Sequence, residues 1–167
     1  MLRSCLAPLA ALRTSLLYGL LCLAVSLTAA RAADDPGQAD LDGAIDAKLS
    51  ANDLQDFQQV LDLCKRALDK GLAEDSAKFA EDLYTSTLID RASMIVDAIF
   101  KSPTPSPQWP QMRAFALRDL REAIDRDPAL GPAQLMIARL ETLPGGDKDR
   151  AREAAGAAIE LLADDTL

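Results

Sequence analysis

Residues 115–135, which read FALRDLREAIDRDPALGPAQL, decide the fold class. Ala116, Leu120 and Ala123 place small and larger apolar side chains at helical spacing. Pro128 fixes its own φ and disfavours a helical conformation at the residue before it, so the first helix must end there. A second apolar pattern of helical period begins almost at once. The stretch therefore predicts two helices joined by a short turn, either as an ordinary helix–turn–helix or as one joint of a repeating array.

A related pattern recurs further along the chain. The run Ala158-Ile-Glu-Leu-Leu-Ala163 echoes Ala123-Ile-Asp-Arg-Asp-Pro128 at a displacement of 35 residues. This resembles the second helix and exit turn of a tetratricopeptide repeat, a family whose small-x₃-large…Pro pattern recurs about every 34 residues. Nine residues carry this repeat signature: Ala116, Leu120, Ala123, Pro128, Ile137, Ala138, Ala151, Ala155 and Ala158.

The resemblance implies an all-α fold of antiparallel helix pairs, stacked as a short or incomplete right-handed α-solenoid. It covers roughly half of the exported chain, and some positions depart from the family pattern. Gln134 and Glu141 stand where the family has larger or aromatic residues, and Ala163 stands where a proline is usual. An unrelated small helical bundle is the alternative.

The first 32 residues have the three-part design of a secretory signal peptide. Arg3 and Arg13 precede an apolar run from Ser15 to Ala30, and no acidic residue occurs before residue 33. Ala30-Arg31-Ala32 has the small-x-small pattern of a cleavage site, so we expect cleavage after Ala32 and export to the periplasm or the extracellular space. The alternative is a membrane anchor that is not cleaved. The apolar run of 16 residues is, however, shorter than the ~20 residues that a helix needs to span a bilayer.

The exported chain is strongly acidic. The leader would remove three of the 18 basic residues and none of the 26 acidic ones, which leaves a net charge of −11. Such acidity opposes binding to nucleic acid and to anionic membranes, because each phosphate contact requires Lys or Arg. We therefore expect neither nucleic acid nor an anionic membrane as a partner. A protein or peptide that is basic or of mixed charge is expected instead.

Behind the leader we expect an acidic flexible tether at 33–52, with a short helix through Leu41 and Ile45, and a repeat-like helical domain at 53–167. Asn52 is the expected N-cap of that domain's first helix, and Gly71 its C-cap. The expected helices of the domain cover residues 53–70, 75–100, 111–126, 132–142 and 148–163.

Four prolines between residues 102 and 110 prevent a helix from passing through this segment, so a polyproline-like crossing is expected. An SH3-type ligand is the alternative, but arginines in the usual register are absent. Trp109, the only tryptophan, is expected to fold back onto neighbouring helices.

The composition excludes most covalent chemistry. The chain contains no histidine, which removes the Ser-His-Asp and Cys-His constellations and the HExxH zinc site. Cys64 is the only cysteine beyond the leader, and its helical spacing with Val60 and Leu68 predicts an inert thiol in the core. No phosphate-binding glycine loop occurs. We expect no enzyme activity, no cofactor and no metal site.

Two acidic clusters resemble sites only superficially. Asp40 and Asp42 imitate part of a calcium loop, but Leu49 occupies the slot of the bidentate acid. The carboxylates of residues 119–127 alternate with arginines, which is typical of an exposed helix face with i,i+3 and i,i+4 pairs.

The carboxy-terminal helix is expected to leave Leu161, Leu162 and Leu167 facing water, because no polar capping helix follows. Self-association through this edge is one solution. The other is that the chain is the front end of a longer array, as in long exported bacterial repeat proteins.

The leading hypothesis for function is a non-catalytic module that binds a peptide or protein in a helical groove. The alternatives are the amino-terminal repeat region of a larger exported enzyme and a standalone bundle.

Overall fold

The computed structural model describes residues 35–164, and a compact unit begins at Gly37. The expected leader at 1–32 and Leu167 lie outside the described residues. The unit consists of α2 (Gln38–Ser50), α3 (Leu54–Lys70), α4 (Glu74–Lys101), α5 (Trp109–Arg126), α6 (Gly131–Glu141) and α7 (Lys148–Asp164). No strand occurs among these residues, so the predicted all-α class is confirmed. The five helices expected after residue 52 are present, with ends shifted by at most two residues.

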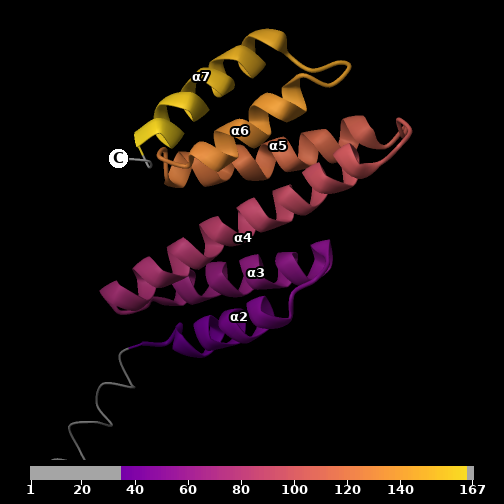
Figure 1. Cartoon of the computed structure of the whole chain (residues 1–167). Coiled ribbons are helices and arrows are strands. Elements are labelled where there is room, and N and C mark those ends of the chain that lie inside the picture. The colour runs from indigo at the N-terminus through magenta and orange to yellow at the C-terminus, as the bar shows by residue number, and fades with distance from the viewer. Residues whose placement is uncertain (1–34, 165–167) are drawn as a thin grey trace, which may run out of the picture. The chain divides into compact units, whose positions relative to one another are not determined.

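The helices follow one another in chain order from α2 to α7 (Figure 1). Each helix packs against the next one, so that α2 lies along α3, α4 along α5, and α6 along α7. In addition, α4 contacts both α2 and α6, whereas no Cα atoms of α3, α5 and α7 approach one another within 8 Å in the described unit. The even-numbered helices are therefore the more closely spaced side of the stack.

The helix α2 belongs to this packing. Leu41 and Ala44 are buried, and the amide of Gly37 donates a hydrogen bond to the carbonyl oxygen of Gly71 at the end of α3 (3.0 Å). The part of 33–52 that forms α2 is thus anchored to α3 along its length.

Asp53 caps the start of α3. Its carboxylate accepts hydrogen bonds from the amides of Gln55 and Asp56, both at 2.8 Å, and the Asp56 carboxylate accepts from the Asp53 amide in return. The expectation that Asn52 is the N-cap is wrong, because the Asn52 side chain donates to the carbonyl of Ser50 instead. At the other end, Gly71 adopts a φ of 94°, which favours glycine and ends the helix after Lys70 as expected.

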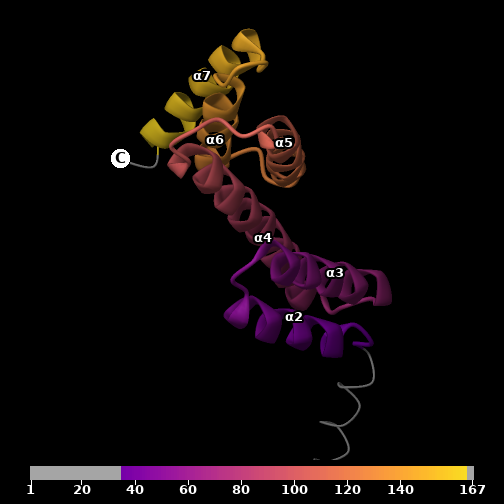
Figure 2. The same ribbon diagram turned by 90° about the vertical axis from the view of Figure 1, so that its right-hand side faces the viewer.

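The long helix α4 is shared by two parts of the core. Figure 2 shows it running between the α2–α3 pair and the α5–α7 group. Its first half contributes Tyr84 and Leu88 to a cluster with side chains of α2 and α3, including Cys64, which is fully buried as predicted. Its second half, from Ala92 to Ile99, packs against α5, α6 and α7.

The proline-containing segment between α4 and α5 ends where α5 begins. Pro110 lies in the first turn of α5, where its missing N–H costs no helical hydrogen bond. Trp109 is half-buried against the cluster formed by α4, α5, α6 and α7, which confirms the expectation that it folds back.

The end of α7 packs inward. A Cβ atom added to Gly131 would lie 2.9 Å from Cγ of Leu162, so glycine allows α7 to approach the start of α6. Leu161 and Leu162 are half-buried there, and the expectation that they face water is wrong. The exposed side of α7 is mostly charged, and its one large apolar residue is Ile159, which is 71% exposed.

No helix in the described range is both long enough and apolar enough to cross a membrane.

Candidate binding surfaces

A groove lies between α4 and the joint of α5 with α6. It has a volume of about 440 Å³, and we call it the α4 groove. Its lining residues are Glu81, Asp82, Thr85, Ser86, Ile89, Arg126, Asp127 and Leu130. The first five project from successive turns of α4, because positions three and four apart share one helix face. The last three come from the end of α5 and the turn that precedes α6.

The α4 groove combines an acidic rim with apolar positions. Three carboxylates, from Glu81, Asp82 and Asp127, line it against one guanidinium, that of Arg126. Ile89 and Leu130 are half-buried and supply its apolar surface. The groove can therefore hold a cationic group beside a small apolar one.

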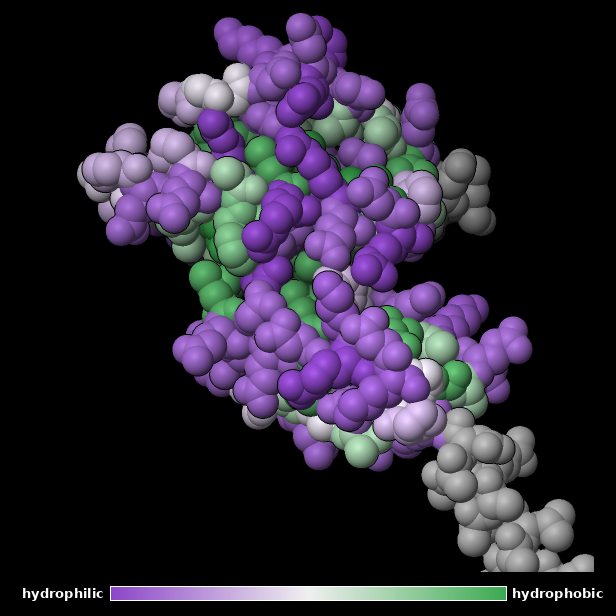
Figure 3. Space-filling view, turned by 180° about the vertical axis from the view of Figure 1, so that it is seen from behind, coloured by the Kyte–Doolittle hydropathy of each residue, from purple (hydrophilic) through white to green (hydrophobic). Residues whose placement is uncertain are grey.

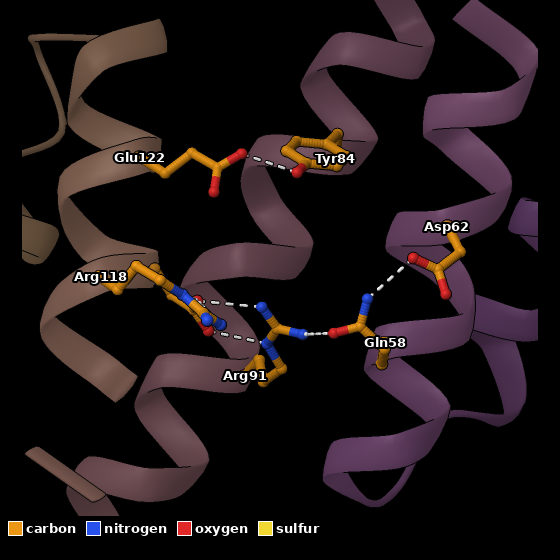
Figure 4. Close-up of polar contacts among 7 residues, drawn as sticks. Gln58, Asp62, Tyr84, Arg91, Arg118 and Glu122 are labelled. Carbon is orange, nitrogen blue, oxygen red and sulfur yellow. Dashed lines mark hydrogen bonds and ion pairs between the residues drawn. The ribbon is translucent and has the colours of Figure 1, made fainter. Parts of the chain in front are cut away.

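Arg126 is engaged by its neighbours. Its guanidinium lies over the ring of Tyr84, 4.3 Å from the centroid, and 3.6 Å from a carboxylate oxygen of Glu122. The Tyr84 hydroxyl donates a 2.7 Å hydrogen bond to the same carboxylate (Figure 4). Burial, followed by the hydrogen bond and charge of Glu122, raises the pKa of Tyr84 to about 12. These contacts link α4 to α5 beside the groove. Because the charge of Arg126 is compensated by Glu122, the carboxylates of the groove are its dominant charge.

A buried polar cluster lies further along α4. The guanidinium of Arg91 donates to both carboxylate oxygens of Asp119, at 2.7 and 2.9 Å. It also donates to the side-chain oxygen of Gln58 (Figure 4). Arg118 adds a second contact to Asp119 at 3.1 Å, and both arginines lie over the ring of Phe115. The cluster joins α3, α4 and α5, and its central pair is closed to solvent, so its role is to hold the helices together.

The expectation that the carboxylates of residues 119–127 form an ordinary exposed face is wrong for Asp119, which is fully buried. The sequence did contain a signal for this pair. Asp119 lies on the same helix face as Ala116 and Ala123, and Arg91 lies on the buried face of α4 between Leu88 and Ile95. Two opposite charges on the apolar faces of consecutive helices indicate a buried pair.

The nine repeat-signature residues lie mainly at helix contacts. The buried members are Ala116, Leu120, Ala123, Ile137, Ala138, Ala151 and Ala158. Ala155 is half-buried against the cluster of α4 to α7, and Pro128 is exposed in the turn between α5 and α6. None of the nine lines the α4 groove, so they contribute to helix packing rather than to the surface of that groove.

The remaining candidates show no arrangement for metal chemistry. Asp40 pairs with Lys70 and Arg66 of α3, and the hydrogen bond from Lys70 lowers its pKa. Asp42 accepts a hydrogen bond from Gln38. In the described range, no three His, Cys, Asp or Glu side chains are grouped so that they could hold a metal ion.

The rest of the described surface is mainly hydrophilic. Seen from behind, apolar residues appear among predominantly hydrophilic ones (Figure 3). The large apolar side chains with the greatest exposure are spread over five helices: Leu49, Leu54, Phe79, Phe100, Leu135 and Ile159. Recognition on such a surface depends on charge supported by individual apolar contacts.

No protein-family model matches the chain, and neither a curated protein nor a solved structure matches it.

Proposed function

We propose that the chain is an exported, non-catalytic interaction module with a tetratricopeptide-like stack of helix pairs, and that it binds a basic peptide segment in the α4 groove. The packing of each helix against the next one along the chain supports the stack. The closer spacing of α2, α4 and α6 supports it too. The resemblance places residues 132–142, which form most of α6, in a first helix, and in that family the first helices of the repeats line the binding groove.

The character of the α4 groove carries the proposal. Three carboxylates face a single arginine that is already engaged by Tyr84 and Glu122, in a chain whose net charge is −8. A peptide with Lys or Arg would gain Coulomb energy at Glu81 and Asp82, and long-range attraction would speed its association.

Ile89 and Leu130 define the rest of the expected ligand. Because both are only half-buried, a Leu, Val or Met side chain of the peptide would cover them. Burying such a side chain contributes roughly 1.5–3 kcal/mol at most. The best ligand is therefore a short segment in which one medium-sized apolar residue lies within a few residues of two or more basic ones.

Peptide binding tests this proposal. A fluorescently labelled peptide set that varies the number of Lys and Arg residues around one Leu is titrated with residues 33–167, and anisotropy is measured at several salt concentrations. We expect saturable binding that strengthens with peptide charge and weakens with salt. The double variant Glu81→Gln/Asp82→Asn should weaken binding about tenfold.

The matched control is Asp69→Asn/Glu153→Gln, which removes the same charge from exposed positions of α3 and α7. It should bind like the parent. If the two double variants lose equal affinity, net charge rather than the α4 groove governs binding. If no peptide of the set binds saturably, the proposed function is wrong.

Export is part of the same proposal and has its own test. The full chain, carrying a carboxy-terminal tag, should be recovered outside the cytoplasm with Ala33 as its first residue by mass spectrometry. Recovery of an uncleaved, cytoplasmic chain would contradict it.

A further inference from the structure

A second cavity lies between the first half of α5 and the loop that joins α6 to α7. It is an open depression with a volume of about 660 Å³, and we call it the α5–α7 cavity. It shares no lining residue with the α4 groove. Six charged side chains line it: Arg113, Arg121, Glu141, Asp147, Lys148 and Arg150.

The charge of this cavity is opposite to that of the chain. Four cations face two carboxylates, in a protein of net charge −8. Both oxygens of the Glu141 carboxylate are used, one by Arg121 at 3.1 Å and the other by the amide of Asp147 at 3.0 Å. The Asp147 carboxylate accepts from the amides of Asp149 and Arg150 and contacts the Arg150 guanidinium.

The other two cations have no carboxylate partner. Arg113 donates to the carbonyl oxygens of Pro144 and Gly145, at 3.0 and 2.8 Å, which leaves its charge uncompensated. No residue of the described range accepts a hydrogen bond from the Lys148 ammonium or forms an ion pair with it. An excess of two positive charges therefore faces the cavity.

The loop between α6 and α7, which forms one wall of the cavity, is held in place. Arg113 fixes the loop on one side, and buried Glu141 fixes it on the other. At Gly146 the loop approaches the backbone of α6 so closely that an added Cβ atom would lie 2.2 Å from the carbonyl oxygen of Glu141. Because this loop is already ordered, the binding of an anion beside it does not have to order the loop.

We propose that the α5–α7 cavity binds a small dianion that carries a phosphate group or two carboxylates. The Arg113 guanidinium uses one N–H of Nη1 and one of Nη2 on the loop and keeps its other N–H donors for a ligand, and the Lys148 ammonium adds a mobile point charge. Arg113 and Lys148 are the two contacts that the ligand would make, while Arg121 and Arg150 stay paired and contribute to the local potential.

Anion titrations at constant ionic strength test the proposal. Inorganic phosphate and succinate are added separately to residues 33–167, with chloride as the compensating anion, and binding is followed through the backbone amide resonances of residues 141–150. We expect saturable shifts with at least one of the two dianions. Tighter binding of phosphate indicates a phosphate ester as the natural ligand, and tighter binding of succinate indicates a dicarboxylate.

Lys148→Gln should weaken the binding about tenfold, and it leaves the fold intact because the side chain makes no described contact. Lys78→Gln, at an exposed position of α4, is the matched control and should bind like the parent. Absence of saturable shifts with both dianions overturns the proposal, and so does equal loss in both variants. Because peptide binding in the α4 groove is measured separately, failure here leaves that proposal standing.

Discussion

The Arg91 guanidinium and the Asp119 carboxylate form a buried, two-point ion pair between α4 and α5, with donor–acceptor distances of 2.7 and 2.9 Å. The pair lies where α4 passes from one hydrophobic cluster to the other, between Leu88 and Ala92. It therefore links the two helices by a buried polar contact at the point where the two clusters meet.

Removing one partner of this pair should be strongly destabilising. Asp119→Ala leaves the charge of Arg91 buried without its carboxylate, and we expect a loss of about 3–5 kcal/mol in the free energy of unfolding. Urea denaturation followed by circular dichroism gives the value. Replacing both partners, as in Arg91→Met/Asp119→Leu, should recover most of the loss, because the two charges are then no longer desolvated. A loss below about 1 kcal/mol for Asp119→Ala would show that the pair contributes little.

Two glycines near α7 should respond in opposite ways to the same substitution. Gly156 lies within α7 with no atom within 4 Å of an added Cβ, so Gly156→Ala should stabilise the protein by about 0.5–1 kcal/mol through helix propensity and chain entropy. Gly146→Ala would place its Cβ 2.2 Å from a backbone oxygen, and we expect a loss of about 1–3 kcal/mol.

Thermal unfolding of the two glycine variants beside the parent checks both signs. Equal effects of the two substitutions would contradict the close approach of the α6–α7 loop to α6.

The buried thiol of Cys64 should make stability depend on alkaline pH. Burial raises the pKa of this thiol from 9.0 to about 11. Below pH 9 the thiol is protonated in both states, so its contribution to stability is fully present. Between pH 9 and 11 the unfolded chain loses the proton first, and the parent should lose roughly 2–3 kcal/mol relative to Cys64→Ala.

Parallel measurement of the parent and Cys64→Ala by urea denaturation from pH 8 to 11 isolates this effect. The cavity left by the substitution shifts the Cys64→Ala curve by a constant amount, and Tyr84 contributes equally to both proteins, so only the difference in slope matters. Parallel profiles would contradict the raised pKa.

The helical periodicity was sufficient to predict the elements and much of the core. The expected helix ends differ from the observed ones by at most two residues because Gly71, Pro110 and Pro128 each impose a backbone constraint that acts locally. The burial of Cys64 followed for the same reason, since its neighbours at helical spacing are apolar.

The two candidate binding surfaces could not be predicted in this way. The α4 groove joins Asp82 to Leu130, and the α5–α7 cavity joins Arg113 to Lys148, across helix pairs whose contact depends on tertiary packing. The inward position of Leu161 and Leu162 also depends on such packing, because it requires the close approach of α7 at Gly131.

The start of α3 offers a direct comparison of the predicted and observed caps. Asp53 accepts hydrogen bonds from two amides of the first turn, whereas the Asn52 side chain bonds only to the carbonyl of Ser50. Asp53→Ala should therefore lower the free energy of unfolding by about 0.5–2 kcal/mol, and Asn52→Ala by clearly less. Asp53→Asn keeps an oxygen that can accept from the same amides and should retain most of the stability. Urea denaturation of the three variants ranks them, and a larger loss for Asn52→Ala than for Asp53→Ala would restore Asn52 as the capping residue.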